Sequence, residues 1–441
     1  MAENNPEPNQ KRNWMIADLH IHSRFSRACS KKINIPNLAK WGKIKGLDLI
    51  GTGDFSHPIW IKELKETLVE KKDESGEGTG IYFYEKDNDR FKFIITGEIS
   101  LIYTQGHGRK AHLVLLIPNI QTAEKINSYL DTKGRRDYDG RPIFKISCEE
   151  FTKDMMNISK DIEVIPAHIW TPYFGVFGSM SGFDSLKEAF GEQLENIHAI
   201  ETGISSDPHM NAKISELKKI AIVSFSDSHS FWPYRLGREA TIFKKSDSYK
   251  DIIKQIRERT FIGTIETDPA YGKYHFDGHR KCGFSCSPEK TKELKGICPK
   301  CRKSLTLGVD YRVEDLAHKH SESDEVAGKP LFDTKKYYTL LPLHEIISLH
   351  TGVGMQSKTV WKIYNDLIEK FGNEFNVLLD VSREEFIEKG VEPKLIGLIL
   401  KNRSANIRVN PGYDGVYGEA LVESTSENKE AISTSSQKTL F

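Results

Sequence analysis

The sequence predicts an α/β protein whose main domain is a closed or distorted barrel of β/α units. Short β-branched or apolar runs alternate with helical or loop stretches from Trp14 to about residue 265. The runs are apolar on both faces, as parallel strands covered by helices are. The pattern then changes to a cysteine-containing, lysine-rich stretch, and helical periodicity returns near residue 343. The sequence therefore predicts a barrel followed by smaller units.

Each expected strand is a short apolar run between polar or glycine-containing segments. Seven or eight such runs suit a barrel, and the stretches 66–80 and 133–141 read as surface excursions. The expected strands are 15–20, 47–52, 91–98, 111–117, 162–168, 196–202 and 220–229, with a further one at 261–266.

The chain of 441 residues is long enough for two or three domains. Its Ser/Thr/Glu-rich segment 422–437 cannot form a core, so we expect a disordered tail there. The predicted division is a polar tail at 1–13, the barrel at 14–270, a cysteine lobe at 271–317, a linker at 318–330, a helical DNA-binding domain at 331–418 and a tail at 419–441.

The charge balance excludes a globally basic or acidic protein, because 63 Lys and Arg face 62 Asp and Glu. A polyanionic partner must therefore meet a local patch. No apolar run approaches the roughly 18 residues of a membrane span. Four of the six cysteines cluster together, which suits metal binding in a reducing compartment. We expect a cytoplasmic protein, associated with the nucleoid.

Residues of metal-ligand type stand near the carboxyl end of almost every expected strand. His20 and His22 in DLHIHS, like Asp227 and His229 in SFSDSHS, are spaced i, i+2, so each pair leaves one face of an extended segment. Strand carboxyl ends converge on one mouth of a barrel, where these side chains should gather. The expected metal ligands are His20, His22, Asp54, His57, Glu98, His112, His168, Asp227 and His229.

Taken singly, these residues have ordinary explanations. A lone His112 or His168 in an apolar strand is more often a core histidine, and Asp54 suits a turn. Together they favour a metal cluster. Imidazole with carboxylate favours zinc, manganese or iron over oxygen-only sites, and a cluster of ions suits phosphoryl transfer. We expect two or three divalent ions, Zn, Mn or Mg, bridged by Glu98, with Asp227, Glu98 and His229 as catalytic residues.

These motifs resemble those of the PHP (polymerase and histidinol phosphatase) family. The resemblance implies a distorted (β/α)7 barrel with a trinuclear site. One departure is Phe55, where many relatives have a histidine directly after the motif's aspartate. By resemblance, His20, His22, Glu98 and Asp227 hold one ion, Glu98, His112 and His168 hold the second, and Asp54 or His57 with His229 holds the third.

The four clustered cysteines are Cys282, Cys286, Cys298 and Cys301. Two close pairs separated by a short loop are typical of one structural zinc ion. Ten Lys and Arg face four Asp and Glu between residues 271 and 312, which favours contact with a DNA backbone. The alternative is a zinc ion that only holds a small lobe together.

The last third reads as short helices at 343–350, 358–371, 383–390 and 393–403. It is similar to tandem helix-hairpin-helix modules, which grip DNA backbone, although any small helical bundle shares this periodicity. Exposed N–H groups near Gly352 and Gly354 suit a phosphate. The residues expected to hold backbone phosphates are Arg24, Arg27, Arg109, Lys110, Arg235, Arg280, Lys281, Gly352 and Gly354.

The chain ends in SQKTLF, in which Gln437, Leu440 and Phe441 resemble a shortened sliding-clamp-binding motif. A hydrophobic plug on a flexible tether suits recruitment to such a ring. The order of barrel, cysteine lobe, helical unit and clamp tail resembles the endonuclease Q family of DNA repair nucleases over nearly all of residues 14–441.

That resemblance implies cleavage of DNA 5′ to a deaminated base (uracil, hypoxanthine or xanthine) or an abasic site, leaving 3′-hydroxyl and 5′-phosphate. Such an enzyme extracts the damaged nucleotide from the stack. The aromatic loop 168–183 is the expected pocket. The alternative for each aromatic residue is burial in the core. The expected pocket residues are Trp170, Tyr173, Phe174, Ser179 and Ser181.

Two other functions use the same residues. A small-molecule phosphatase like histidinol phosphatase needs the metal site but leaves the lobe, helices and tail without purpose. A non-catalytic DNA-binding adaptor riding the clamp would keep the cluster only for structure, which the nearly complete ligand set argues against.

Overall fold

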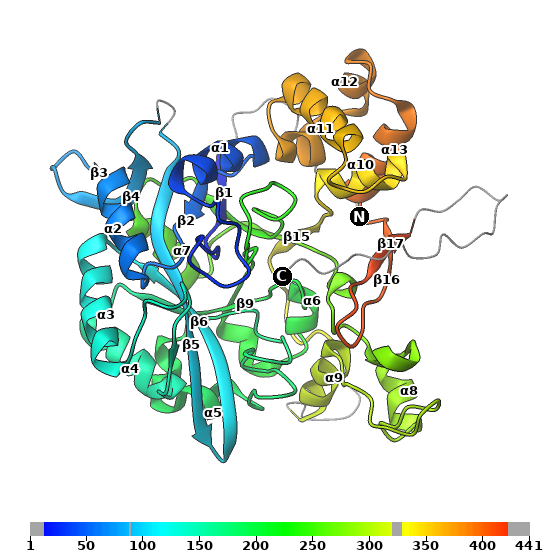
Figure 1. Ribbon diagram of the computed structural model, residues 1–441, viewed down its shortest axis with the longest axis horizontal. Coiled ribbons are helices and arrows are strands. Elements are labelled where there is room, and N and C mark those ends of the chain that lie inside the picture. Colours follow the sequence, from blue (N-terminus) through cyan, green and yellow to red (C-terminus); the bar gives the residue numbers. More distant parts are fainter. Residues whose placement is uncertain (1–12, 88–89, 320–328, 422–441) are drawn as a thin grey trace.

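The computed structural model describes residues 13–87, 90–319 and 329–421. Residues 14–266 form most of a large mixed sheet wrapped by helices, with the later helical unit and the small lobe beside it (Figure 1). The clamp-type residues Gln437, Leu440 and Phe441, the tail 1–12 and most of the linker 318–330 lie outside the described residues. No described helix is long and apolar enough to cross a membrane.

All eight expected strands are present. They are β1 (Trp14–Asp18), β2 (Leu49–Gly51), β5 (Lys92–Gln105), β6 (His107–Ile117), β8 (Glu163–Pro166), β9 (Ala199–Glu201), β10 (Ala221–Val223) and β12 (Gly263–Glu266). The sequence did not reveal β3 (Leu68–Lys72), β4 (Gly78–Tyr84), β7 (Ile143–Phe144), β11 (Ala240–Lys244) or β15 (Lys336–Thr339). The stretch 66–80, expected as a surface excursion, contributes to the β3–β4 hairpin.

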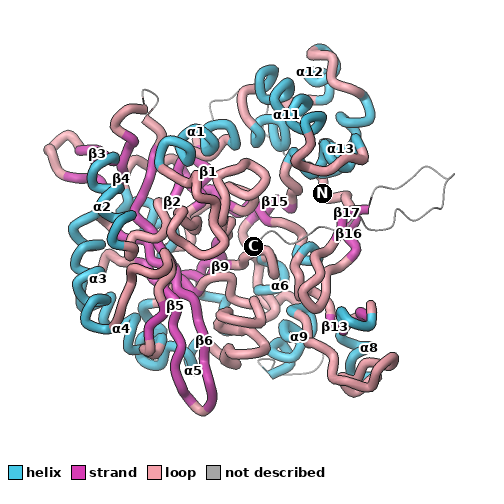
Figure 2. Tube along the Cα trace, viewed as in Figure 1, coloured by secondary structure: helices cyan, strands magenta, loops and turns pink. Residues whose placement is uncertain are grey.

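The expected all-parallel arrangement is wrong for part of the sheet. β1, β2 and β5 run parallel, but β5 pairs with β6, and β6 with β8, in antiparallel fashion. Only Gly106, at φ +71°, separates β5 from β6, because a tight turn reverses the chain there. This long hairpin projects from the sheet (Figure 2). β9 and β10 form a separate parallel pair.

Alternate strand residues supply two cores on opposite faces of the sheet. Ile16 and Ile50 belong to the larger core, which also includes residues of the helices α1 to α4, whereas Ala17 and Leu49 belong to a second core with α7. The covering helices are α1 (Ile35–Lys45), α2 (Pro58–Thr67), α3 (Ile120–Lys133), α4 (Cys148–Ile158) and α7 (Tyr249–Arg257). This packing fixes the strand ends that carry the site.

The loop regions after β8, β9 and β12 contain further short helical elements. These are α5 (Leu186–Phe190), η1 (Gly191–Asn196), α6 (Pro208–Asn211), η2 (Ser215–Lys219) and η3 (Pro269–Tyr271).

The small lobe contains β13 (Asp277–His279), η4 (Arg280–Cys282), β14 (Phe284–Cys286), α8 (Pro288–Glu293) and α9 (Val309–Lys319). The glycine-rich loop 410–418 returns to this lobe, where the Phe276 amide donates a hydrogen bond to the Gly412 carbonyl at 3.0 Å. The strand pair β16 (Arg408–Asn410) and β17 (Glu419–Leu421) flanks that loop.

The helical unit contains α10 (Leu343–Thr351), α11 (Lys358–Phe371), η5 (Asn376–Asp380), α12 (Arg383–Glu388) and α13 (Pro393–Arg403) around its own apolar core. β15 precedes it and pairs in parallel with β12 of the main sheet. The region 331–418 therefore contributes to the main sheet and to the lobe as well as to the helices.

Candidate metal centre

The first and the last predicted ligands in the sequence lie close together, just after β1 and β10. Ile21 bridges Ser228, and the His22 amide donates to the Ser228 carbonyl at 2.9 Å. This pairing brings the DLHIHS and SFSDSHS segments side by side. The side chains of His20, His22 and Asp227 therefore face one another from segments more than two hundred residues apart.

The first group of candidate ligands consists of His20, His22, Glu98 and Asp227, whose ligand atoms all lie within 4.8 Å of one another. Nε2 of His22 lies 2.9 Å from Oδ1 of Asp227 and 3.4 Å from Oε2 of Glu98. All but Asp227 are fully buried. A shielded cluster of two imidazoles and two carboxylates is a donor set suited to a transition-metal ion.

The second group shares Glu98. Its Oε1 lies 2.8 Å from Nδ1 of His112 and 3.2 Å from Nε2 of His168. Glu98 and His112 lie on the same face of the β5–β6 ladder, because Glu98 pairs with Val114, two residues from His112. One carboxylate thus presents its two oxygens to two different groups of ligands.

The charges within the cluster control its protonation. Burial favours the neutral form of Glu98, but the contact with His112 and the nearby Arg141 and His20 outweigh burial and hold the pKa of its carboxyl well below the usual value. Burial lowers the pKa of His112 to about 3, so this imidazole is neutral near pH 7. A carboxylate beside a neutral imidazole is the form that binds a metal.

The surroundings of one atom support the fit of these residues to a metal ion. Nε2 of His20 is buried without a hydrogen-bond partner, 3.5 Å from Oδ1 of Asp227 and 3.7 Å from Oε2 of Glu98. Its other ring nitrogen, Nδ1, is held by Glu201 at 2.9 Å. A buried nitrogen aimed between two carboxylates is unfavourable without a bound cation or proton.

The backbone is strained at three of these positions. Asp54 and Asp227 both have φ +47°, and His168 has φ +31°. Left-handed conformations at residues other than glycine cost on the order of 1–3 kcal/mol and cluster at functional sites. The strain turns each side chain toward the cluster at the end of its strand.

Three predicted ligands lie beside the two groups without joining them. Both oxygens of Asp54 are engaged, Oδ1 with Nδ1 of His22 at 2.9 Å and Oδ2 with Ser23. His57 caps α2 and stacks on Phe25 with ring centroids 4.1 Å apart. His229 stands at the mouth, with its ring 4.5 Å from the ring of His22. The ligand set expected for a third ion is thus not gathered into a group.

Phe55, the departure from the PHP motif, is fully buried in the main core. Asp54 instead orients His22 through the hydrogen bond to Nδ1, as carboxylates behind metal-binding histidines do.

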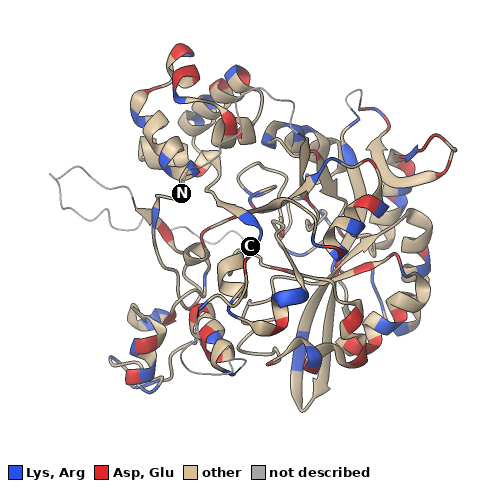
Figure 3. Cartoon of the chain, turned by 180° about the vertical axis from the view of Figure 1, so that it is seen from behind, with Lys and Arg blue, Asp and Glu red and all other residues tan. Residues whose placement is uncertain are grey.

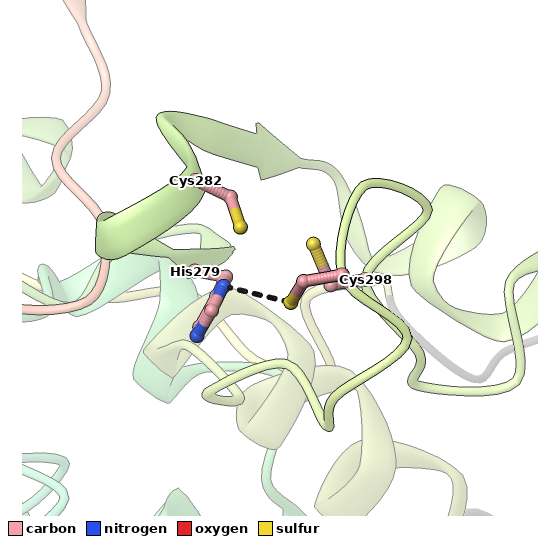
Figure 4. Close-up of side chains that lie close together, drawn as sticks. His279, Cys282 and Cys298 are labelled. Carbon is pink, nitrogen blue, oxygen red and sulfur yellow. Dashed lines mark hydrogen bonds between the residues drawn. The ribbon is translucent and has the colours of Figure 1, made fainter.

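The small lobe gathers His279, Cys282, Cys298 and Cys301, whose ligand atoms lie within 4.8 Å of one another (Figure 4). Nδ1 of His279 lies 3.4 Å from Sγ of Cys301. Cys286, predicted as the fourth ligand, is outside the group and contacts Oγ1 of Thr291 at 3.3 Å. One histidine with three cysteines is a tetrahedral zinc ligand set.

The lobe also carries fewer free cations than its composition indicates. Lys290 pairs with Glu293 and Lys292 with Glu314, so acidic residues are interspersed among the basic ones (Figure 3). Arg280 and Lys281 are exposed, as a backbone contact requires.

Two of the arginines expected to contact DNA are engaged within the protein. Arg24 is paired with Glu63, and Arg109 is buried against Glu188 and the Gly182 carbonyl. Their guanidinium groups therefore stabilise the fold. Arg27 and Arg235 are exposed, and Lys110 is half-buried over the Phe174 ring at 5.7 Å.

Gly352 ends α10 rather than starting a helix, and it has φ +69°. Gly390, between α12 and α13, has the same φ value. No atom lies within 4 Å of a Cβ built at Gly352, Gly354 or Gly390, so all three present open backbone at helix-to-helix turns.

The aromatic loop 168–183 divides into core and surface. Trp170 is fully buried and donates to Asn211 at 2.8 Å, which makes it a core residue. Ser181 is also buried. Phe174 stacks on His112 with centroids 4.1 Å apart, and Tyr173 is 48% exposed. Of the expected pocket residues, Tyr173, Phe174 and the partly exposed Ser179 lie where a substrate can reach them.

Three residues of these sites were missed from the sequence. Glu201 ends an expected strand, as Glu98 does, and this position was a usable signal. His279 precedes Cys282 by three residues, a zinc-ligand spacing that was also readable. Arg141, 2.9 Å from Glu98 through Nη1, lies in a stretch that resembled surface loop and gave no signal.

Comparison with known proteins finds solved structures that are similar to this chain over nearly its whole length. The crystal structure of a lesion-specific endonuclease from Pyrococcus furiosus, PfuEndoQ, matches 93% of this chain and 95% of its own, with 30% identity and a TM-score of 0.79. An endonuclease Q bound to a 27-mer duplex with an abasic lesion at its active site matches equally well, with a TM-score of 0.79 and 30% identity.

Two sequence relatives extend the comparison. A Bacillus subtilis protein, YqxK, is 26% identical over 92% of this chain and 98% of its own. The Methanocaldococcus jannaschii protein MJ0043 is 32% identical over 65% of this chain, which spans only 34% of that longer protein. Residues 342–406, which contain α10 to α13, match the family model of the MJ0043 C-terminal domain.

The buried histidine and carboxylate groups, carried by the β5–β6 hairpin and by loops that follow strands of an α/β domain, together with the match to a lesion-specific endonuclease, define the class of this protein as a nuclease-type enzyme with candidate metal sites. The near full-length match at 30% identity then identifies the family to which the chain belongs. The chain belongs to the endonuclease Q family.

Proposed function

We propose that this protein is a metal-dependent DNA repair endonuclease. The observation that carries the proposal is the position of Glu98, whose two carboxylate oxygens face two separate groups of ligands. Two neighbouring divalent-ion sites that share a carboxylate suit phosphodiester hydrolysis. Membership of the endonuclease Q family and the abasic-site duplex bound by one solved member support DNA as the substrate.

The roles of the residues follow from their positions. A divalent metal bound by the two groups would supply a water of lowered pKa and neutralise charge on the phosphate. Glu98 spans both groups and fixes their separation. Asp227 completes the first group, and its partial exposure places it toward solvent. His229, partly exposed above His22, is positioned to transfer a proton at the mouth of the site.

The finer specificity is also a proposal. We infer cleavage 5′ to a uracil, hypoxanthine, xanthine or abasic site, with 3′-hydroxyl and 5′-phosphate ends. Phe174 stacks on His112 and the neighbouring Tyr173 is exposed, and aromatic faces are suited to stack against an extracted nucleotide. Ser179 is the remaining polar candidate on that rim.

The appended parts would hold the DNA. The open turns at Gly352 and Gly390 suit backbone phosphates, and the exposed Arg280 and Lys281 extend the same surface chemistry to the lobe. We propose that the terminal residues Gln437, Leu440 and Phe441 bind a sliding clamp, which an interaction measurement with full-length and truncated chains tests.

The experiment is an incision assay with labelled duplexes that carry one abasic site, deoxyuridine or deoxyinosine beside an undamaged control. We expect cleavage of the lesion strands alone, loss of cleavage in chelator and its return with Mn²⁺ or Zn²⁺. Sequencing of the product ends locates the cut. Hydrolysis of a small phosphate monoester without any incision of DNA would instead favour a phosphatase.

A further inference from the structure

The segment between α3 and β7 folds over the metal centre rather than away from it. A Cβ built on Gly140 would lie 2.2 Å from Oδ2 of Asp54, so the loop backbone touches the residue that orients His22. The Gly140 amide donates to the Phe25 carbonyl at 3.1 Å, and its carbonyl accepts from Ser56 at 3.1 Å. Only glycine fits so close an approach.

The next turn of the loop is fixed on its other side. The Ser100 amide donates to the Pro142 carbonyl at 3.1 Å, and Ser100 is two residues from Glu98 on β5. Arg141 therefore lies between two anchored neighbours. The backbone that carries its side chain is thus held at the edge of the cluster by contacts with β5 and with Asp54.

The guanidinium of Arg141 reaches the shared carboxylate. Its Nη1 lies 2.9 Å from Oε2 of Glu98, and the side chain is 22% exposed. Among the described residues, Glu98 is the one partner that this guanidinium contacts, so most of its five N–H donors are free. Arg24 and Arg109, by contrast, are each engaged by a carboxylate and a carbonyl away from the cluster.

A fixed, partly exposed cation with free donors at the edge of a carboxylate-bridged cluster suits a phosphate. An arginine fork matches phosphate geometry and stabilises charge that develops on non-bridging oxygens. We propose that Arg141 is a catalytic residue that donates to a non-bridging oxygen of the scissile phosphate. This inference rests on the proposed endonuclease function for its substrate, but the anion-binding role follows from Arg141 itself.

The test compares full-length wild type with Arg141→Met and Arg141→Lys. The matched control is Arg135→Met, because Arg135 is an exposed residue of the same loop that pairs only with Asp137. Three quantities are measured: metal content by mass spectrometry, affinity for inorganic phosphate by calorimetry, and the single-turnover rate on an abasic-site duplex. Guanidinium ion is then added to Arg141→Ala to look for chemical rescue.

We expect Arg141→Met to keep its metal, to bind phosphate about tenfold more weakly and to cleave on the order of a hundredfold more slowly. The phosphate affinity and cleavage rate of Arg141→Lys should lie between those of Arg141→Met and wild type. Added guanidinium should partly restore the cleavage rate of Arg141→Ala. Unchanged phosphate affinity in Arg141→Met at equal metal content would overturn the assignment. If wild type bound phosphate through Arg141 but cleaved no lesion duplex, the endonuclease function would fail while the anion-binding role of Arg141 stood.

Discussion

Glu201 holds two candidate ligands at once. Its carboxylate accepts a hydrogen bond from Nδ1 of His20 at 2.9 Å and from the backbone amide of His168 at 2.7 Å. The first contact leaves Nε2 of His20 facing Glu98 and Asp227, and the second fixes the strained backbone of His168. Glu201 therefore links the two ligand groups from behind, as carboxylates behind metal-bound histidines do.

Replacing Glu201 should weaken metal binding. We expect Glu201→Ala to lower metal affinity by about 10- to 100-fold, because His20 loses the partner that fixes its ring and tautomer. Glu201→Gln should lose less metal affinity, since its amide oxygen can still accept a hydrogen bond from Nδ1 of His20. Metal retained after dialysis against graded chelator measures the effect, with the exposed pair residue Glu124→Ala as control. Equal retention in wild type and Glu201→Ala would refute this role.

Stability should fall as pH rises toward 8 because of Glu239. Burial raises the pKa of this carboxyl from 4.5 to about 8, helped by the nearby Glu201 and Asp18. A raised folded-state pKa gives stability that is complete below the unfolded value and is lost as pH rises through the folded value. Glu239→Gln cannot ionise, so its free energy of unfolding should decline less between pH 5 and 9 than that of wild type, while the exposed Glu195→Gln should follow wild type.

The small lobe should need His279 and not Cys286 for zinc. His279→Ala removes a member of the group formed with Cys282, Cys298 and Cys301, whereas Cys286→Ala removes only a contact with Thr291. We expect His279→Ala to lose zinc to a chelator at least tenfold more readily and Cys286→Ala to keep it. Zinc release measured with a colorimetric indicator decides between them. Loss of zinc from Cys286→Ala with zinc retained in His279→Ala would instead support the predicted set of four cysteines.

The helical unit should depend on a buried ion pair with the main domain. Nζ of Lys45 at the end of α1 lies 2.7 Å from Oε1 of Glu374, with both side chains almost fully buried. Lys45→Met leaves the Glu374 charge unpaired, which should cost about 3–5 kcal/mol. The double variant Lys45→Met, Glu374→Gln should recover part of that loss. Urea denaturation measures both, with the exposed Lys40→Met expected to match wild type.

The sequence predicted the strands and the inner cluster because both follow local patterns. Apolar runs marked every strand that carries a ligand, and the i, i+2 spacing of His20 with His22 put two ligands on one face. The grouping of Glu98, His112 and His168 was implied by the resemblance to the PHP family, and the structure brings the three side chains together. A ligand-type residue in or just after an apolar run is therefore readable from sequence, although Glu98 and His112 lie inside longer strands than expected.

The antiparallel hairpin and the surroundings of Asp54 and His57 were not readable from the sequence. Strands buried on both faces are apolar in either direction, so β5 and β6 carried no mark of their pairing, and the single-residue turn at Gly106 was the one clue. Asp54 and His57 carry ligand-type side chains, but hydrogen bonds with Ser23 and a ring contact with Phe25 already engage them. Arg141 depends on how a loop folds across the site, which no short pattern encodes.

The most direct test is metal titration of stripped full-length protein, with Glu98→Gln beside wild type, followed by incision of an abasic-site duplex. Stripped wild type should not cut, and its activity should return as the two groups that share Glu98 are filled. Glu98→Gln, which lacks the negative charge shared by both groups, should stay at least a hundredfold slower at the same metal concentration. Incision by stripped protein, or wild-type recovery of Glu98→Gln, would contradict the proposed mechanism.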